Sequence, residues 1–210
     1  MNIINHLEWR YACKKFDSNK KLKEDQVDLL KKAFNLSATS YGLQPLKLLI
    51  VKNDPLKEKL LPLAYYQKQV STCSHILVIC IDTAFGADDI DAYFDREKQI
   101  RGVSEAIVGK FRQQLKVVYS KKTQKEIEDS AIYQAYIALG TLMTVCAEQR
   151  IDSCPMEGFN AKKLDEELGL KDKNLRSVLL LPVGFRAEDD FMRKMKKVRK
   201  PLSEVIIELD

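Results

Sequence analysis

The chain has 210 residues, of which 45% are hydrophobic and 31% are charged, and its formal net charge is +5. These are globular proportions, and a chain of this length can bury a core without disulfides or a structural metal. Its apolar runs are shorter than the roughly 20 residues that a membrane-spanning helix requires, and its N-terminus lacks a signal or transit pattern, so we expect a cytoplasmic protein without a membrane partner.

The N-terminal segment begins with a short helix signal. Ile3, Ile4 and Leu7 recur on one helical face and predict a helix that ends near Trp9. Residues 10–17 show no such period, and we expect them to form an extended connector.

A second amphipathic helix is predicted at residues 24–36, where apolar side chains recur at helical spacing and neither proline nor glycine intervenes. Small and turn-forming residues at 37–45 precede an apolar run at 48–51, which predicts a buried strand. The sequence at 53–55, Asn-Asp-Pro, then supplies a helix start, because proline is tolerated in the first turn.

The rest of the chain continues this alternation. Apolar runs predict strands, helical periodicity predicts helices, and Asn160 and Gly169 bracket the shortest of those helices. The elements expected there are a strand at 75–81, helical stretches at 90–119 and 124–149, a connector at 151–155, a helix at 160–169, and strands at 177–183 and 203–209.

The helix at 124–149 is apolar nearly all round, which is typical of the central helix of a core or of a dimer interface. Its ends are too polar for a membrane span. Strands that alternate with helices predict an α+β or α/β sandwich in which helices cover a sheet. No repeat, low-complexity tract or linker divides the chain, so we expect a single domain over residues 1–210.

Several familiar catalytic signatures are absent from the sequence. No Gly-x-Gly-x-x-Gly follows a strand and no phosphate loop ends in Gly-Lys-Ser/Thr, so a dedicated dinucleotide domain is not expected. The two histidines, His6 and His75, have no acid or thiol arranged around them, and we therefore expect structural roles and no metal site. The five cysteines are widely spread and include no Cys-x-x-Cys pair, which favours buried reduced thiols.

Two early segments are candidates for ligand binding. Arg10 and Lys14 lie four residues apart in the connector, a spacing that suits two parts of an elongated anionic ligand, although basic pairs beside helices usually face water. In the turn at 40–45, Gly42 lets the backbone approach a ligand and Gln44 offers both a donor and an acceptor. Alone, this second segment is merely a turn before a strand.

Two later segments complete the set of candidates. Residues 155–159 form a connector whose glycine, Gly158, exposes a backbone N–H. Residues 193–200 hold six cations among eight residues, including Lys197 and Arg199, so we expect an anion to bind there. A nucleic-acid or membrane surface is the alternative for this tail, but the tail lacks interleaved aromatic side chains and the rest of the chain is nearly balanced in charge.

In this order, and over nearly the whole chain, these segments resemble the FMN-dependent NAD(P)H nitroreductase family. The shared pattern is an Arg-x-x-x-Lys-x-Phe-Asp start at 10–17, Gln-Pro before the first strand, Ser-His opening the second, Pro-x-Glu-Gly at 155–158, and a late Lys-x-Arg at 197–199. The resemblance implies an α+β, nitroreductase-like fold with a central, mostly antiparallel sheet covered by helices. It also implies a homodimer with a long interface helix and with FMN at the subunit interface.

The resemblance further implies roles for single residues. Arg10, Lys197 and Arg199 would bind the FMN phosphate, whose charge guanidinium groups match with bidentate hydrogen bonds. Lys14 would lie near the N1/C2-carbonyl side of the flavin and favour its reduction, so we expect it to act as a tuning residue. Glu157 and Gly158 would lie beside flavin N5, with the Gly158 N–H as a donor, and these two with Lys14 form the expected catalytic set.

The wider site is also carried over from the family pattern. Ser40, Tyr41 and Phe111 would border the face on which substrates stack, and the turn at 40–44 would come from the partner subunit or line the flavin edge. The cofactor-binding residues implied are Arg10, Tyr11, Ala12, Lys14, Ser40, Gly42, Leu43, Gln44, Tyr66, Gln69, Pro155, Met156, Glu157, Gly158, Lys197 and Arg199.

Three positions depart from the commonest family pattern. Ala12 replaces a frequent serine, Tyr66 replaces asparagine, and Leu46 replaces tryptophan. The first two changes remove polar contacts to FMN, so the cofactor is expected to be held differently or less tightly, with Gln69 as a compensating polar residue.

The implied activity is ping-pong transfer of hydride from NADH or NADPH, through flavin N5, to nitroaromatics, quinones or similar small electron-poor acceptors. One alternative is a flavin, dihydropteridine or quinone reductase whose physiological substrate is not a nitro compound. The other is a flavin-holding or nucleic-acid-binding protein without turnover, although we expect no nucleic-acid partner.

Overall fold

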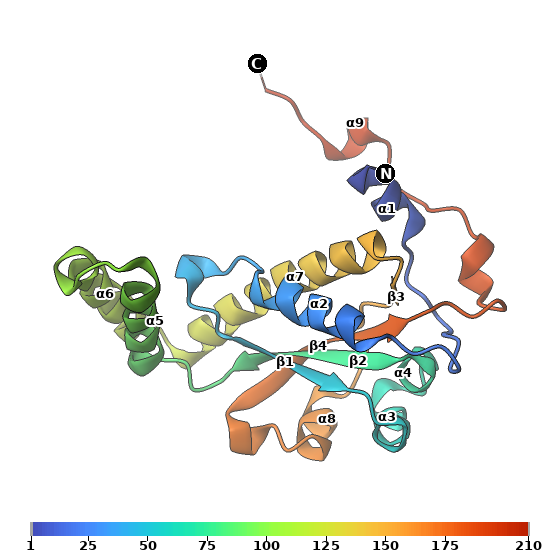
Figure 1. Cartoon of the computed structure of the whole chain (residues 1–210), viewed down its shortest axis with the longest axis horizontal. Coiled ribbons are helices and arrows are strands. Elements are labelled where there is room, and N and C mark those ends of the chain that lie inside the picture. Colours follow the sequence, from blue (N-terminus) through green and yellow to red (C-terminus); the bar gives the residue numbers. More distant parts are fainter. Residues whose placement is uncertain (1, 210) are drawn as a thin grey trace.

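The computed structural model describes residues 2–209, and this part of the chain contains one four-stranded sheet (Figure 1). Neighbouring strands all run antiparallel, which confirms the expected, mostly antiparallel sheet. In spatial order the strands are β1 (Leu46–Val51), β2 (His75–Asp82), β4 (Leu175–Gly184) and β3 (Asp152–Ser153). The short β3 lies within the segment that was expected to be a plain connector.

The central strand β2 divides the core into two apolar clusters. Successive side chains of a strand point to opposite faces of the sheet. Leu77 and Ile79 therefore pack in one cluster, whereas Ile76 and Val78 pack in the other. Because both faces are buried, the sequence of β2 is a continuous apolar run without the alternation of a half-exposed strand.

Helices cover both faces of this sheet, as expected for the α+β class (Figure 1). α2 (Glu24–Asn35) and the long α7 (Gln124–Glu148) pack together over one face. α3 (Asp54–Leu60), α4 (Gln69–Thr72) and α8 (Ala161–Glu167) lie over the other. The predicted ends of α2 and α7 lie within one residue of those observed, and Asn160 caps α8 as expected.

α7 is long and apolar enough to cross a membrane if length and composition alone are considered. In this fold it contacts α2, β2 and β4. Nine of its side chains are buried, among them Ala135, Ala138 and Leu142. It is therefore the central helix of the core, one of the two roles that its sequence predicted.

α5 (Ala87–Arg101) and α6 (Glu105–Ser120) form a helical hairpin beside the sheet, with a third apolar cluster of its own. The prediction of one helical stretch over residues 90–119 was wrong. Gly102, at φ +66°, ends α5 in the left-handed conformation that commonly terminates helices. The chain then reverses before α6 begins.

The two ends of the described chain lie on the same side of the molecule (Figure 1). α1 (Ile3–Trp9) is the helix predicted there. The strand predicted at residues 203–209 was wrong, because α9 (Leu202–Val205) is a single helical turn and residues 206–209 pair with no described strand. A strand needs a neighbour to bind, and this tail extends away from the body of the chain.

Four short 3-10 turns complete the architecture. Two of them lie in segments that matter for the site, one before β1 and one in the C-terminal tail. They are η1 (Ser40–Gly42), η2 (Pro62–Ala64), η3 (Lys171–Lys173) and η4 (Phe191–Lys194).

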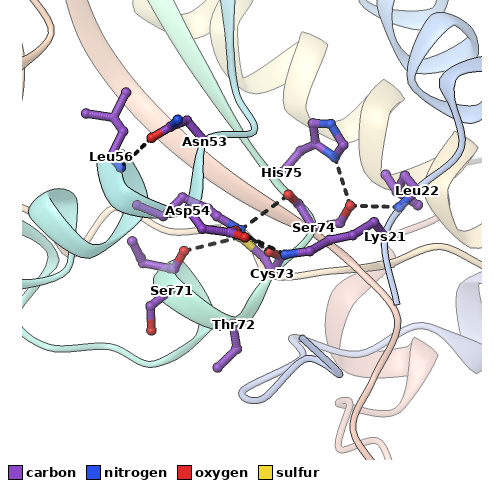
Figure 2. A network of polar contacts seen from close by, with 12 residues as sticks. Lys21, Leu22, Asn53, Asp54, Leu56, Ser71, Thr72, Cys73, Ser74 and His75 are labelled. Carbon is purple, nitrogen blue, oxygen red and sulfur yellow. Dashed lines mark hydrogen bonds and ion pairs between the residues drawn. The ribbon is translucent and has the colours of Figure 1, made fainter. Parts of the chain in front are cut away.

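A polar network fixes the start of β2 against α3 (Figure 2). Ser74 Oγ hydrogen-bonds to His75 Nδ1 at 2.9 Å. The fully buried ammonium of Lys57 donates to the carbonyls of Cys73 and Ser74 and pairs with Asp54 at 2.6 Å. A buried lysine is tolerated here because its charge and its donors are both satisfied.

Both histidines are buried, as expected for structural residues. His6 Nδ1 lies 3.2 Å from the carbonyl oxygen of Ala147, which ties α1 to the end of α7. The five cysteines are all free and buried, which confirms the expected reduced thiols. Burial raises the pKa of the Cys73 and Cys80 thiols to about 12, so these groups are neutral and unreactive.

Candidate active site

The connector after α1 is fixed along its whole length. It runs beside β3, where Cys13 N–H donates to the Ser153 carbonyl at 3.2 Å and Ala12 forms a parallel bridge to the same residue. Cys13 and Phe16 point into the core. Arg10 and Lys14 remain only partly buried, so their charged groups are available at the surface of a rigid segment.

A stack of rings and guanidinium groups holds the end of α1. The Arg186 guanidinium lies 4.2 Å from the centroid of the Trp9 ring and 4.5 Å from that of Tyr11. The Arg150 guanidinium lies 4.8 Å from the Trp9 centroid. Trp9 is the only tryptophan in the sequence and immediately precedes Arg10, so cation–π contacts fix the segment from which Arg10 projects.

Three cations from the two ends of the chain converge. Lys197 Nζ donates to the main-chain oxygen of Arg10 at 2.5 Å. Burial lowers the pKa of Arg10, and the charge of Arg199 lowers it further. Burial likewise lowers the pKa of Lys197, with additional repulsion from Arg10 and Arg199. We call these three residues the cation cluster.

The cation cluster contains a buried N–H without an acceptor and positive charges that repel one another. The Nε atom of Arg10 is buried and has no hydrogen-bond partner among the described residues. Buried donors are nearly always bonded in native proteins, and like charges that lower one another's pKa destabilise their own charged forms. A bound anion would accept the free N–H and relieve the repulsion.

Lys14 lies next to the cation cluster and faces a neutral thiol. Its Nζ is 3.7 Å from Cys154 Sγ, and its main-chain N–H donates to Asp190 at 3.0 Å. Burial raises the pKa of the Cys154 thiol even though Lys14 opposes that shift. Within residues 2–209 no carboxylate pairs with the Lys14 ammonium.

The segment after β3 forms a tight turn at Glu157 and Gly158. Met156 bridges to Leu180 through hydrogen bonds in both directions, and its side chain is buried, so it anchors the turn. Phe159 N–H donates to the Glu157 carbonyl at 2.9 Å. The Gly158 N–H donates to none of the described residues.

Side chains from two other elements hold this turn. Tyr136 of α7 donates from its hydroxyl to Glu157 Oε1 at 2.8 Å, and this bond raises the pKa of Tyr136. Gln67 Nε2 donates to the Gly158 carbonyl at 2.7 Å, and Gln69 Nε2 in turn donates to Gln67 Oε1 at 3.1 Å. Gln69 is buried, and it supports the turn through its hydrogen bond to Gln67.

Tyr66 lies on the loop between α3 and α4, three residues before the start of α4. It is 72% exposed, and its φ of +58° is in the left-handed region that non-glycine residues rarely adopt. No hydrogen bond or ring contact from residues 2–209 fixes its side chain. The position at which the family pattern has asparagine thus presents a free aromatic ring.

The turn at 40–44 belongs to another part of the chain. Ser40 N–H donates to Gln134 Oε1 at 2.8 Å, and Gln44 Nε2 donates to the Asn35 carbonyl at 2.9 Å. A Cβ on Gly42, whose φ is +74°, would lie 3.1 Å from the Tyr93 ring of α5, so glycine is required here.

Two further members of the predicted site lie beside that turn. The Tyr41 and Phe111 rings pack edge to face with centroids 6.0 Å apart, which brings the predicted substrate-binding residues together. Leu43 is buried in the third apolar cluster, so its side chain packs against the α5–α6 hairpin.

The predicted site residues thus fall into two groups within one chain. Glu157 is held by Tyr136, and Ser40 is held by Gln134. Two residues of a helix that are two positions apart project about 200° apart around its axis. Glu157, which follows the segment that Lys14 contacts, and the group around Ser40 therefore lie on opposite sides of α7, with the second beside the α5–α6 hairpin (Figure 1).

Four residues of these groups were not found by sequence reasoning: Gln67, Gln134, Tyr136 and Asp190. Gln134 did carry a signal, because it is a polar residue in the middle of a nearly apolar helix and is 5% exposed. Asp190 accepts three of its four hydrogen bonds from residues 176 or more positions away, so its link to the connector could not be read from a local pattern.

The chain is similar to known proteins over nearly its whole length. A family profile described as "Nitroreductase family" matches residues 7–185. A protein of Staphylococcus haemolyticus described as an NAD(P)H nitroreductase is 32% identical, covering 97% of this chain and 95% of its own length. The major NAD(P)H-flavin oxidoreductase of Aliivibrio fischeri is 26% identical, covering 97% of each.

Solved structures give the same fold. A protein of Exiguobacterium sibiricum, described as a nitroreductase in complex with FMN, superimposes with a TM-score of 0.86 over 100% of this chain and 98% of its own. Its sequence is 19% identical, so this likeness concerns the fold.

Proposed function

The chain belongs to the nitroreductase family, and from this premise we propose that it is an FMN-dependent oxidoreductase that uses NAD(P)H to reduce small electron-poor acceptors such as nitroaromatics and quinones. A relative named as an NAD(P)H-flavin oxidoreductase and a neighbour solved with FMN support the cofactor and the co-substrate. The chemical class of the acceptor is part of this proposal.

The cation cluster is the observation that carries this proposal. An FMN phosphate has about two negative charges near neutral pH and several acceptor oxygens. It would accept from the unpaired Nε of Arg10 and lie between the three positive charges. Arg10, Lys197 and Arg199 therefore suit this group better than a neutral ligand.

When bound, FMN would supply two-electron chemistry, namely the transfer of hydride from NAD(P)H to the acceptor. The residues of the chain would bind the flavin and orient it. Lys14 would provide a fixed positive charge where reduction adds negative charge, and its position beside a neutral thiol leaves that charge uncompensated. The Gly158 N–H, held by the anchored turn, is a free donor for a ring nitrogen.

Two departures from the family pattern bear on cofactor affinity. Ala12 is engaged in a main-chain bridge to Ser153 and has no polar side chain to offer. Tyr66 exposes its ring beside the turn at Glu157 and Gly158. We infer that the phosphate contacts provide a larger share of the FMN affinity here than in members with serine and asparagine at these positions.

The protein is further proposed to act as a homodimer, as one domain per chain and in the cytoplasm. Because the two groups of site residues lie on opposite sides of α7, a complete site would combine the cation cluster of one copy with the Ser40 group of another. Exposed apolar side chains support such an interface, since patches of this kind mark interaction surfaces. They include Ile3, Ile4, Leu7, Tyr133, Ile137, Leu202, Ile206, Ile207 and Leu209.

The free edge of β1 is a second argument for a dimer. β1 pairs only with β2 among the described strands. A groove of about 900 Å³ lies along it, lined in part by Leu46, Leu48, Ile50 and Tyr93. The residues 206–209 of a second copy, which follow α9 and begin extended at Ile206, are proposed to pair along this edge.

Spectroscopy tests the proposed function directly. The purified protein is expected to be yellow, or to become so when FMN is added, and to bleach when NADH or NADPH is added without oxygen. A steady-state panel of nitroaromatics, quinones, free flavin and a dihydropteridine then identifies the acceptor class. A colourless protein that FMN cannot reconstitute would contradict the proposal.

A flavin reductase is the second candidate function, favoured by the relative from Aliivibrio fischeri. The same panel separates the two, because free flavin would then be the best acceptor by kcat/KM.

A further inference from the structure

Asp190 lies at the junction of the connector and the C-terminal tail. Its carboxylate is 4% exposed. Oδ2 accepts hydrogen bonds from Tyr11 Oη at 3.0 Å, from Cys13 Sγ at 3.3 Å and from Lys14 N at 3.0 Å. Oδ1 accepts from Met192 N at 3.1 Å. One buried side chain thus collects four donors from two distant segments.

The donors around Asp190 are all neutral. No cation among residues 2–209 forms a salt bridge with it, in contrast to Asp152, which pairs with Arg186. Burial by itself would raise the pKa of Asp190, but the hydrogen bonds from Met192, Lys14 and the other two donors outweigh burial and leave the pKa below its ordinary value. The carboxylate is therefore ionised, as three donors on a single oxygen require.

Each of the two carboxylate oxygens controls one part of the site. The bond to Lys14 N–H fixes the main chain from which the Lys14 ammonium projects toward Cys154. The bond to Met192 N–H caps η4, from which the chain leads to Lys197 and its contact with Arg10.

We propose that Asp190 is a positioning residue that couples Lys14 to the cation cluster by holding the connector and the tail on one carboxylate. The inference rests on the proposed function, since Lys14 and the cation cluster are its ligand-facing groups. Asp190 itself is buried and would act through the residues whose N–H, O–H and S–H groups it accepts from.

The neighbouring Asp189 is a matched control. Its side chain is 68% exposed and pairs with Lys15 at the surface. Asp189→Asn removes the same charge one residue away without touching the connector main chain at Lys14. In Asp190→Asn, an amide NH₂ has to face donors on one side, so one of the two sets of hydrogen bonds is lost.

The first measurement is FMN binding to the apoprotein, followed by flavin fluorescence. Asp190→Asn is expected to raise the Kd at least fivefold, because the tail no longer brings Lys197 and Arg199 to Arg10, whereas Asp189→Asn stays within twofold of wild type. Equal Kd values for the two variants would overturn the coupling.

The second measurement is the midpoint potential of the bound flavin, measured at saturating FMN. Loss of a nearby negative charge, acting through space, would raise this potential. Displacement of Lys14 would lower it, because the reduced flavin loses its stabilising cation. The proposal therefore expects Asp190→Asn to lower the potential, as Lys14→Ala does, and to lower it no further in a Lys14→Ala background.

A raised or unchanged potential in Asp190→Asn, or an equal drop with and without Lys14, would overturn the proposal. If Asp190→Asn does not fold, Asp190→Glu keeps the charge but displaces the carboxylate by one methylene, and the same pattern of potentials is expected. A wild-type protein that binds no FMN would defeat the proposed function as well. If the wild-type protein binds FMN but Asp190→Asn changes neither the Kd nor the midpoint potential, this inference alone is wrong.

Discussion

At the scale of single residues, the site consists of charges that have no opposite charge beside them. Arg10 has a buried N–H without a partner, Lys14 faces a neutral thiol, and Asp190 is surrounded by neutral donors. Surface ion pairs elsewhere, such as Lys15 with Asp189, contribute little to stability. Uncompensated cations such as Arg10 and Lys14 are more useful for binding an anionic ligand than for holding a fold.

Replacement of Arg199 tests the phosphate assignment. Arg199→Ala is expected to weaken FMN binding by roughly tenfold, which corresponds to about 1.4 kcal/mol for one partly solvated charge-assisted contact. Arg193→Ala, an exposed arginine of the same tail outside the cation cluster, is the control and should bind FMN normally. Equilibrium titration of the two apoproteins measures the difference, and equal affinities would remove the tail from the site.

The depressed pKa of Asp190 makes a pH prediction. The folded carboxylate holds its proton less tightly than the unfolded one, whose pKa is about 3.9. Its contribution to stability is therefore complete above that value and disappears as the pH falls toward the folded pKa. The Tm of wild type should exceed that of Asp190→Asn by a margin that narrows from about pH 6 to about pH 3. A difference in Tm that does not change with pH would show that ionisation of Asp190 does not contribute to stability.

Local motifs predicted some of these residues and missed others for a physical reason. Arg10, Lys14 and the turn at Glu157 and Gly158 were found because their spacing lies within short segments. Asp190 and Tyr136 act through contacts with residues far away in the sequence, and only the folded chain brings those partners together.

At the scale of elements, the predictions succeeded where one signal dominated. The buried run of β2 and the continuous helical pattern of α7 were placed correctly because the core demands them. The break at Gly102 was missed because apolar periodicity continues on both sides of it. The prediction of a strand at 203–209 was wrong because a strand sequence cannot form a strand without an edge to pair with.

The attachment of α3 to β2 depends on Lys57. Lys57→Met is expected to destabilise the fold by about 1–3 kcal/mol, because the carbonyls of Cys73 and Ser74 lose their buried donor. Lys59→Met is the control on the same helix, since that side chain is 68% exposed and makes only a surface pair. Urea unfolding of the apoproteins compares them, and an equally stable Lys57→Met would show that the carbonyls find other donors.

At the scale of the whole molecule, α7 separates two groups of predicted site residues, which we propose to be halves of a site shared between two copies. Glu157 lies on the Tyr136 side and the Ser40 group on the Gln134 side. A two-fold dimer would form two equivalent sites from these four halves, as closed symmetric assemblies do.

A charge in the tail tests the dimer. Ile207 is 87% exposed and lies in the segment proposed to pair with β1 of a second copy. Ile207→Asp is expected to shift the protein from dimer to monomer in light scattering at micromolar concentration, and to reduce FMN retention. Val117→Asp, on the exposed side of α6, should remain dimeric. A wild-type protein that is monomeric under these conditions would contradict the arrangement.

The contact of Trp9 with two guanidinium groups has an experimental consequence. Because the chain has only one tryptophan and it precedes Arg10, its intrinsic emission has a single origin next to the cation cluster. A yellow chromophore bound there would accept excitation energy from that indole and quench its emission. Loading and loss of the prosthetic group can then be followed in real time in the unlabelled wild-type chain.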